Sequence, residues 1–398
     1  MKRPKWMNRD VLLLSFSAFF ADLGYQTAVA LLPIIIVAVL GASALIYGIT
    51  TAVAFGVGSL FGYIGGIMST KYNDKYIAIL GNSLIPMLSL LGLANSVFVA
   101  VALFCGGWWA RNFRSPARRK LIVKATTVEN RVKAFGFLHA LDVGGGALSI
   151  IILLVLLFAG ISIGTIVLLT AIPILISTIL IVFTSASNTK PKMDEARKRT
   201  SAAAASTVIK GNLNAYRGIL FATALYGFSS YTFGFPILTI LQKSTVAFAV
   251  LSYGIFLSVS AVAGYLIGIQ KWNKIKALSL AGYIASGIGA LILALAYAYN
   301  LGIFVLFSGV AVLGLGMGAI ETLEPTIISI VRSIRDVGKG MGALAGSRSF
   351  GIFIANIVMG ILYVFSPVDS YIYAAVLAIL AGLVISRYGS GYMEKSVR

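Results

Sequence analysis

The residues of this chain that could do chemistry are few, and most of them stand inside long apolar stretches. Six ionisable side chains do so, and they are four acids, one arginine and the only histidine: Asp22, Asp142, Glu321, Glu324, Arg348 and His139. An ionisable group at the centre of a lipid bilayer is costly unless it faces a cavity or a partner. Each of these side chains is therefore a candidate for binding a proton, an ion or a substrate.

The spacing of these side chains places them in pairs. Residues three or four positions apart share one face of a helix, and three pairs have this spacing: Asp22 with Gln26, His139 with Asp142, and Glu321 with Glu324. An enzyme is not expected, because no nucleophile, base and third group recur at a defensible spacing. Cys105 is the only cysteine, which excludes an intrachain disulfide and a metal site of the cysteine type. No cofactor and no resident metal are expected.

The elements that must hold these side chains are membrane-spanning helices. Hydrophobic residues make up 59% of the chain and charged residues 11%, whereas a soluble domain is about one-quarter charged. Apolar runs between polar breaks predict twelve spans, at residues 11–37, 46–69, 76–94, 97–113, 133–159, 163–186, 215–241, 247–269, 277–298, 302–330, 341–364 and 370–388. The sequence therefore predicts an all-α, multi-pass protein of the cell membrane.

The net charge of +20 follows from this topology. With a cytoplasmic amino terminus, thirty of the 32 Lys and Arg residues fall in seven cytoplasmic segments, the richest of which are 111–133 and 187–217. This positive-inside pattern places both termini in the cytoplasm. Nucleic-acid binding is not expected, because no soluble domain gathers the basic residues. Contact with anionic membrane lipid is expected.

The longest polar stretch divides the spans six and six. We predict an N-terminal bundle at 1–186, a cytoplasmic linker at 187–213 and a C-terminal bundle at 214–398. A constant offset of 206 residues matches Gly136 to Gly342, Asp142 to Arg348 and Gly145 to Gly351. Two parallel six-helix repeats are typical of one large class of secondary transporters, whose substrate binds near the midplane between the halves.

Three motifs of the first half resemble a prokaryotic branch of the major facilitator superfamily. They are Phe20-Ala21-Asp22-Leu23-Gly24-Tyr25-Gln26, Arg114-Ser115-Pro116-Ala117-Arg118-Arg119-Lys120-Leu121-Ile122, and the segment from Ala134 to Asp142. The chain departs from the family pattern at Gln26, where relatives have Glu, at Arg119, where they have Asp, and at Thr70, where they have an acid. The resemblance implies the twelve-helix fold, alternating access and a monomer. It also indicates cytoplasmic gating ion pairs among Arg111, Arg114, Arg118, Lys71 and Asp74.

Charge pairing separates the candidates within the spans. We expect Asp142 to pair with Arg111 or Arg114, and Arg348 with Glu321 or Glu324. Asp22 and one of the two glutamates are then left without a cation. Burial without a cation favours the neutral form of a carboxyl group, which is what a proton carrier needs. Asp22, with Gln26 one turn away, is therefore predicted to bind the coupling proton or a cationic substrate group.

The sequence thus predicts a secondary active transporter whose partners are protons and a small-molecule or ion substrate. Export of a small organic or cationic compound in exchange for protons is preferred, because acids outnumber arginines within the spans. Tyr226 and Tyr231 of the seventh span are candidate substrate contacts, and His139 is a candidate proton relay.

Two alternatives stay open. One is a divalent metal exporter similar to ferroportin-type carriers, with Asp22, Gln26, His139 and Asp142 as ligands. The other is an importer of an anionic metabolite that binds Arg348.

Overall fold

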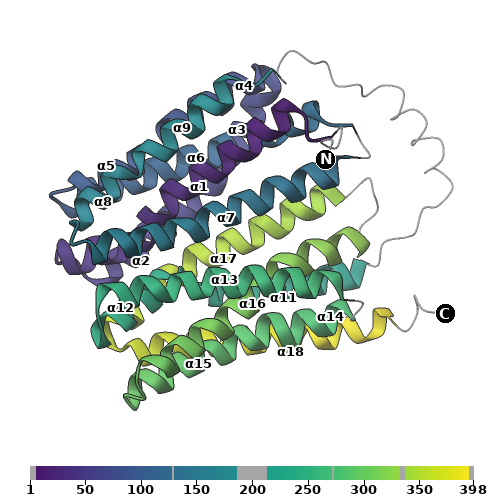
Figure 1. Cartoon of the computed structure of the whole chain (residues 1–398). Helices are drawn as coiled ribbons and strands as arrows, with labels where there is room; N and C mark the ends of the chain where they lie inside the picture. Colours follow the sequence, from purple (N-terminus) through teal and green to yellow (C-terminus); the bar gives the residue numbers. More distant parts are fainter. Residues whose placement is uncertain (1–5, 128–129, 186–212, 271–272, 332–336, 394–398) are drawn as a thin grey trace. The chain divides into compact units, whose positions relative to one another are not determined.

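The computed structural model describes residues 6–127, 130–185, 213–270, 273–331 and 337–393. The regular secondary structure of these residues is helical, and they form no strand (Figure 1). Eleven helices of the described chain are long and apolar enough to cross a membrane. They coincide with eleven of the twelve predicted spans, so the predicted all-α membrane fold is confirmed.

Packing contacts divide the chain into two compact units, unit 1 (residues 1–189 and 232–257) and unit 2 (residues 190–231 and 258–398). Unit 1 contains α1 (Arg9–Pro33), α2 (Ala44–Thr51), α3 (Gly58–Lys71), α4 (Asp74–Leu84), α5 (Met87–Leu90), α6 (Val97–Ala125), α7 (Arg131–Phe158), α8 (Ile163–Leu169), α9 (Ala171–Val182) and α12 (Gly234–Lys243). Unit 2 contains α11 (Leu213–Ser229), α14 (Lys274–Ala277), α15 (Ala285–Ala298), α16 (Ile303–Val331), α17 (Val337–Phe365) and α18 (Pro367–Met393). The helix α13 (Val246–Ile269) begins in unit 1 and ends in unit 2.

The predicted division into two sequential bundles stays a prediction, since packing contacts do not test it. The predicted linker at 187–213 lies, except for Leu213, outside the described residues. The seventh predicted span is formed by two helices, because residues 230–233 between α11 and α12 are not helical. Non-helical backbone at membrane depth is tolerated where it is buried in protein or lines a cavity.

Polar residues set the beginnings of several helices. The side chains of Asn8, Ser43, Asn73 and Ser96 accept hydrogen bonds from backbone N–H groups in the first turns of α1, α2, α4 and α6. Such caps satisfy donors that have no partner within the helix. The polar breaks seen in the sequence are therefore the points where apolar helices start.

One segment predicted as a loop is largely helical. We predicted that the fourth span ends at residue 113 and that a basic cytoplasmic segment follows, but α6 continues as one helix to Ala125. Its second half carries several basic residues, and two of them are buried, with Arg114 0% and Arg118 6% exposed. Hydropathy alone cannot detect this continuation, because buried arginines count against a span.

The two units share one packing arrangement at matched positions. In unit 1 the helix α1 packs against α7 and α9, and in unit 2 α11 packs against α17 and α18 (Figure 1). A Cβ atom on Gly145 of α7 would lie 2.2 Å from the carbonyl oxygen of Phe19 in α1. A Cβ atom on Gly351 of α17 would lie 2.5 Å from the backbone of Gly227 in α11. Both glycines let backbones approach closely, and they are the pair that the offset of 206 matched.

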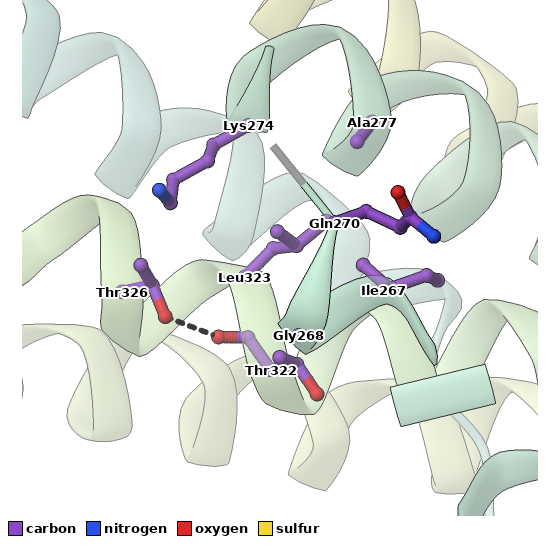
Figure 2. A pocket seen from close by; sticks show the side chains of 8 residues that line it. All are labelled: Ile267, Gly268, Gln270, Lys274, Ala277, Thr322, Leu323 and Thr326. Carbon is purple, nitrogen blue, oxygen red and sulfur yellow. Dashed lines mark hydrogen bonds between the residues drawn. The ribbon is translucent and has the colours of Figure 1, made fainter. Parts of the chain in front are cut away.

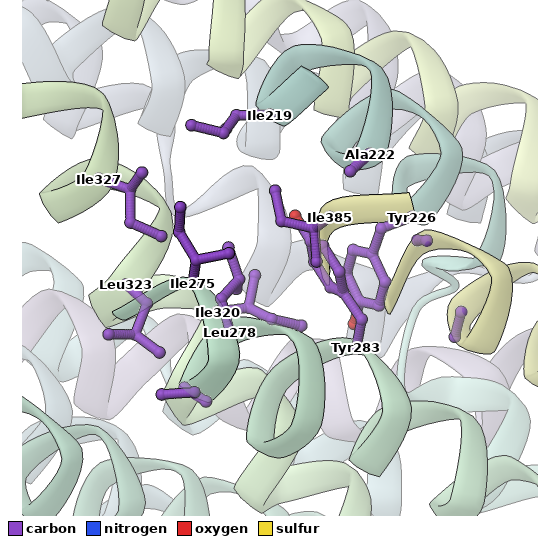
Figure 3. Packing of buried hydrophobic residues seen from close by; sticks show 14 of the residues in the cluster. Ile219, Ala222, Tyr226, Ile275, Leu278, Tyr283, Ile320, Leu323, Ile327 and Ile385 are labelled. Atoms are coloured by element: carbon purple, nitrogen blue, oxygen red, sulfur yellow. The ribbon is translucent and has the colours of Figure 1, made fainter. Parts of the chain in front are cut away.

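Unit 2 has an apolar core around its central helices. Ile219 and Ala222 of α11, Leu278, Ile320 of α16 and Ile385 of α18 belong to it and are at most 2% exposed. Figure 3 shows these side chains converging, with the rings of Tyr226 and Tyr283 side by side at one edge. The two rings stack with centroids 4.8 Å apart. The hydroxyls of these two tyrosines form hydrogen bonds with polar side chains of unit 2.

Candidate functional site

The first cluster of ionisable groups surrounds Asp22 in unit 1. Asp22 lies near the middle of α1 and is only 4% exposed. Its Oδ1 atom accepts hydrogen bonds from the hydroxyl of Tyr25 and from Nε2 of Gln26, the latter at 3.3 Å. The Oε1 atom of Gln26 accepts a hydrogen bond of 2.9 Å from the hydroxyl of Tyr253. The other oxygen of Asp22, Oδ2, is buried, and no N–H or O–H group of the described residues donates to it. The carboxyl group of Asp142 lies within hydrogen-bonding reach of Asp22, so the two acids could share a proton.

Three arginines of α6 line the same region at positions i, i+3 and i+7. The guanidinium of Arg111 lies over the rings of Tyr25 and Trp108, at 4.9 Å and 4.7 Å from their centroids. Cation–π contacts of this kind stabilise a positive charge away from water. Arg111 also interacts electrostatically with Asp22. Asp22 therefore has a cation among its interacting groups, Arg111, although we expected it to be left without one.

The predicted partner of Asp142 was wrong. Asp142 of α7 pairs with Arg118, whose Nη2 lies 3.4 Å from Oδ2 of the carboxylate, instead of with Arg111 or Arg114. Our error follows from expecting a loop after residue 113, where the structure has the second half of α6 and Arg118 faces Asp142. Asp142 and Asp22 also interact electrostatically with each other.

Asn82 of α4 connects Arg114 to two other helices. Its side-chain oxygen accepts a hydrogen bond from Nη1 of Arg114. Its Nδ2 atom donates to Ser177 at 3.2 Å and to Thr178 at 2.7 Å. Ser177 of α9 donates in turn to the carbonyl oxygen of Ser17 in α1 at 2.7 Å. This buried network joins four helices and fixes the orientation of Arg114.

The second cluster surrounds Glu324 in unit 2. Glu324 of α16 is 0% exposed. Its Oε1 atom accepts hydrogen bonds from the hydroxyl of Tyr283 at 2.5 Å and of Thr223 at 3.3 Å. Its Oε2 atom lies 2.5 Å from Nη2 of Arg348, which pairs through Nη1 with Glu321. Both oxygens of the buried carboxylate therefore have partners.

This second cluster corrects one expectation. We expected Arg348 to match one glutamate and leave the other without a cation, but it binds both. The two acids are one helical turn apart, and a guanidinium can offer a separate N–H group to each. The side chain of Glu321 is 57% exposed, so it forms the outer part of this pair.

The other predicted residues have varied positions. Tyr226 donates to Oγ of Ser286 at 3.3 Å, and Tyr231 packs edge-on against the ring of Tyr371. His139 is exposed. Among the described residues, no group of three or more His, Cys, Asp or Glu side chains is gathered as a metal site needs. The alternative ligand set of Asp22, His139 and Asp142 is therefore not assembled.

Asp74, the acid of the predicted cytoplasmic ion pairs, pairs with two lysines outside the predicted set. Asp74, at the start of α4, is 4% exposed and lies 2.8 Å from Nζ of Lys124 and 3.7 Å from Nζ of Lys120, both in α6. Lys71 is exposed at the end of α3. Asp74 thus bonds to α6, and this contact joins the start of α4 to the last turns of α6.

The charge count within the protein also differs from the prediction. Four acids against one arginine favoured a cationic substrate. The helix α6 adds the side chains of Arg111, Arg114 and Arg118 to the interior of unit 1, so acids no longer outnumber arginines. The preference for a cation therefore loses the observation on which it was based.

A separate small pocket lies in unit 2 near the ends of α13 and α16. It has a volume of about 80 Å³ and is lined by Ile267, Gly268, Gln270, Lys274, Ala277, Thr322, Leu323 and Thr326 (Figure 2). The hydroxyl of Thr326 donates a hydrogen bond of 2.7 Å to the carbonyl oxygen of Thr322, drawn as a dashed line in Figure 2. Pockets for organic ligands measure about 300–1,000 Å³, and none of the predicted site residues lines this one.

Sequence reasoning missed the neutral partners of the charged groups, which are Asn82, Thr223, Tyr253 and Tyr283. These residue types are common in membrane helices, and nothing in their spacing marks them. The arginines of α6 did carry a signal, because positions 111, 114 and 118 share one helix face. That spacing indicates a helix that continues past residue 113.

The fold and the polar clusters define a membrane transporter built from long helices. A model of the Major Facilitator Superfamily matches residues 14–331. This chain belongs to that superfamily and is a multi-pass protein of the cell membrane. An uncharacterized MFS-type transporter of Methanocaldococcus jannaschii is 23% identical over 391 residues, which cover 95% of this chain and 94% of that protein.

Solved structures show the same fold at low sequence identity. A POT family transporter in complex with a thioalcohol-conjugated peptide aligns with a TM-score of 0.78 and 12% identity, covering 96% of both chains. A D-xylose–proton symporter aligns with a TM-score of 0.74 and 14% identity, covering 94% of this chain and 96% of that one. A bacterial homologue of the lysosomal transporter Spinster aligns with a TM-score of 0.72 and 14% identity over 99% of both chains. At these identities the likeness concerns the fold.

Proposed function

We propose that this chain is a proton-coupled secondary transporter that exports a small organic compound in exchange for protons, and that Asp22 carries the proton. The observation that supports this proposal is the Oδ2 atom of Asp22, which is buried, accepts no hydrogen bond from an N–H or O–H donor of the described residues, and belongs to a carboxyl group within reach of Asp142. A buried polar atom without a partner is costly, so a proton or a substrate group at this oxygen would be stabilised.

The neighbours of Asp22 make it suited to exchange. Tyr25 and Gln26 hold Oδ1 and thereby fix the orientation of the carboxyl group. Asp142 interacts electrostatically with Asp22 and pairs with Arg118, so a second negative charge on Asp22 would be repelled. Protonation of Asp22 would remove this repulsion, and its Oδ1 atom could still accept from Tyr25 and Gln26.

Exchange follows when a substrate group competes with the proton for the same oxygen. A hydrogen-bond donor or a cationic group at Oδ2 would take the place of the proton, and its release would let the proton return. Alternating access then carries one or the other across the membrane. The proposal includes both neutral and cationic donor groups. With the three arginines of α6 counted, the interior acids no longer outnumber the arginines, so the charge count does not favour a cation.

The test uses the full chain in liposomes filled with a pH-sensitive dye. A library of small organic cations, neutral compounds and organic acids is added outside, and a compound that drives proton movement is a substrate. Asp22→Asn should abolish proton movement with such a compound, because the amide cannot take up a proton. Asp369→Asn, which changes an exposed acid at the start of α18, should move protons like the wild type.

Proton movement that is unchanged in Asp22→Asn would contradict the proposal. Folding is checked separately through thermal unfolding of the variant in detergent. Infrared spectroscopy gives an independent measurement, since a protonated carboxyl band of the wild type should be missing in Asp22→Asn.

A further inference from the structure

We propose that the transported compound carries an oxyanion, a carboxylate or a phosphate, and that Arg114 binds it together with Arg118. This inference rests on the transport function proposed above and names the substrate class for the same unit. It follows from the hydrogen-bond donors and the charge of α6, which the coupling role of Asp22 does not use.

The first argument is the set of buried donors. Arg114 is 0% exposed, yet its Nε and Nη2 atoms have no acceptor among the described residues. The same holds for Nε and Nη1 of Arg118 and for Nε of Arg111. Buried N–H groups of a charged side chain are expensive to leave unbonded. An acceptor with several oxygen atoms would satisfy them.

The second argument is geometric. Nε and Nη2 form one edge of a guanidinium, and this edge binds two oxygens of a carboxylate or phosphate in parallel. This edge of Arg114 has no acceptor, because the one side-chain hydrogen bond that Arg114 makes within the described part of the chain, to Asn82, uses Nη1. In the described part of unit 2, both terminal nitrogens of Arg348 instead form ion pairs with glutamates.

The third argument is that Arg114 is held in place before any ligand binds. Asn82 is itself fixed by Ser177 and Thr178. Next to it, Gly81 brings the backbone of α4 against Arg114, since a Cβ atom on Gly81 would lie 2.9 Å from Cβ of the arginine. A side chain fixed in this way loses little conformational freedom on binding.

The fourth argument is charge. Three guanidinium groups of α6 face two carboxylates, those of Asp22 and Asp142, in the described part of this cluster. The remaining positive charge attracts an anion. Within the described part of the cluster, Arg118 is the arginine that pairs with Asp142, through long contacts of 3.4 and 3.5 Å from Nη2 to its two oxygens. The acids already present therefore do not occupy the open edge of Arg114.

The experiment measures anion binding without any proton gradient. The full chain is purified in an uncharged detergent, and its thermal unfolding is followed with sodium succinate, with inorganic phosphate and with sodium chloride at equal ionic strength. Succinate or phosphate should raise the Tm of the wild type above the value in chloride. Arg114→Gln should lose this rise, and Arg119→Gln, which removes the neighbouring exposed arginine, should keep it.

Arg114→Lys covers the case in which Arg114→Gln does not fold. Lysine keeps the charge but lacks the flat edge, so the apparent affinity for the anion should fall about tenfold. An equal rise in Tm for the wild type and either Arg114 variant would overturn the proposal. So would the absence of any rise above chloride with both succinate and phosphate.

Two further arms separate the possible sources and the two proposals. Phosphatidylglycerol in mixed micelles tests a lipid headgroup, and a rise that depends on Arg114 with this lipid alone would overturn the assignment to a transported compound. Asp22→Asn should still show the rise with succinate or phosphate. Anion binding that persists while Asp22→Asn moves protons normally would refute the coupling role and leave the oxyanion site standing.

Discussion

In each unit an ion pair joins two helices that follow each other in the chain, α6 with α7 in unit 1 and α16 with α17 in unit 2. The acid and the arginine have exchanged helices between the two units. In unit 1 the cation, Arg118, is on α6 and the acid, Asp142, is on α7. In unit 2 the acids are on α16 and the cation, Arg348, is on α17. The offset of 206 residues that matches Asp142 to Arg348 also matches glycines with the same packing role. The backbone arrangement is therefore repeated, while the signs of the charges are not.

The two clusters also differ in how completely their groups are bonded. Both oxygens of Glu324 have partners, and Arg348 pairs with two acids. In unit 1, Oδ2 of Asp22 and one whole edge of Arg114 lack partners among the described residues. Among the described atoms of the second cluster, Nε of Arg348 is buried without a partner, whereas the first cluster has one oxygen and five guanidinium nitrogens in that state. A more fully bonded cluster holds helices together, and one with several unbonded groups has capacity for a ligand. This difference supports the proposal that unit 1 binds the ligand and that the cluster of unit 2 contributes more to structure.

The largest effect is expected from Arg348→Gln. It leaves the buried carboxylate of Glu324 without a cation, and breaking a buried ion pair from one side costs about 3–5 kcal/mol. Thermal unfolding in detergent should show a large drop in Tm. The double variant with Glu324→Gln should recover part of the loss, because no unpaired charge then remains.

Asp142→Asn is the matched change in unit 1. The Asp142 side chain is 24% exposed and its contact with Arg118 is long, so water can solvate part of what is lost. Its destabilisation should be clearly smaller than that of Arg348→Gln. Equal losses would show that the two clusters are equally structural and would remove the distinction drawn here.

The next effect is expected from Tyr283→Phe in unit 2. The hydroxyl donates a hydrogen bond of 2.5 Å to Glu324, and a hydrogen bond to a charged group contributes about 1.5–3 kcal/mol. Chemical denaturation or thermal unfolding would measure the loss. Tyr299→Phe, which changes a tyrosine that is 72% exposed, should leave stability unchanged.

The sequence predicted the spans well because apolar runs and polar caps are local signals. It failed at residue 113, where the local signal and the packed structure disagree. Arg114 and Arg118 lower the hydropathy of α6, but Asn82, Asp142 and the neighbouring helices make their burial possible. Partners of this kind come from distant parts of the chain, and a single sequence does not reveal which of them meet.

The candidate site was predictable in its acids and less so in its partners. Asp22 and Glu324 stood out because carboxylates are rare in apolar runs. Their bonding could not be foreseen, since it depends on Tyr283, 41 positions away from Glu324, and on Tyr253, 227 positions away from Gln26. The number of groups without partners, which separates the two clusters, is a property of packing.

Alanine in place of the matched glycines tests the repeated part of the comparison. A Cβ atom at Gly145 or Gly351 would overlap the backbone of the facing helix, and overpacking costs about 1–3 kcal/mol. Both variants should lower Tm by similar amounts. Gly144→Ala and Gly346→Ala are controls, because a Cβ atom at either position meets nothing within 4 Å. A lower Tm in only one of the two variants would show that the matched glycines do not have the same packing role.

The smallest effect is expected from Tyr253→Phe in unit 1. The hydroxyl of Tyr253 bonds to the neutral side chain of Gln26 at 2.9 Å, and a neutral hydrogen bond contributes about 0.5–1.5 kcal/mol. Tyr265→Phe is the control on the same helix, since Tyr265 is 70% exposed. The unfolding loss for Tyr253→Phe should stay below that for Tyr283→Phe. Release of Gln26 should at the same time weaken its hold on Oδ1 of Asp22, so proton movement in liposomes should change more than stability does. A variant that loses stability but keeps normal proton movement would place Tyr253 and Gln26 among structural groups and confine coupling to Asp22 and Tyr25.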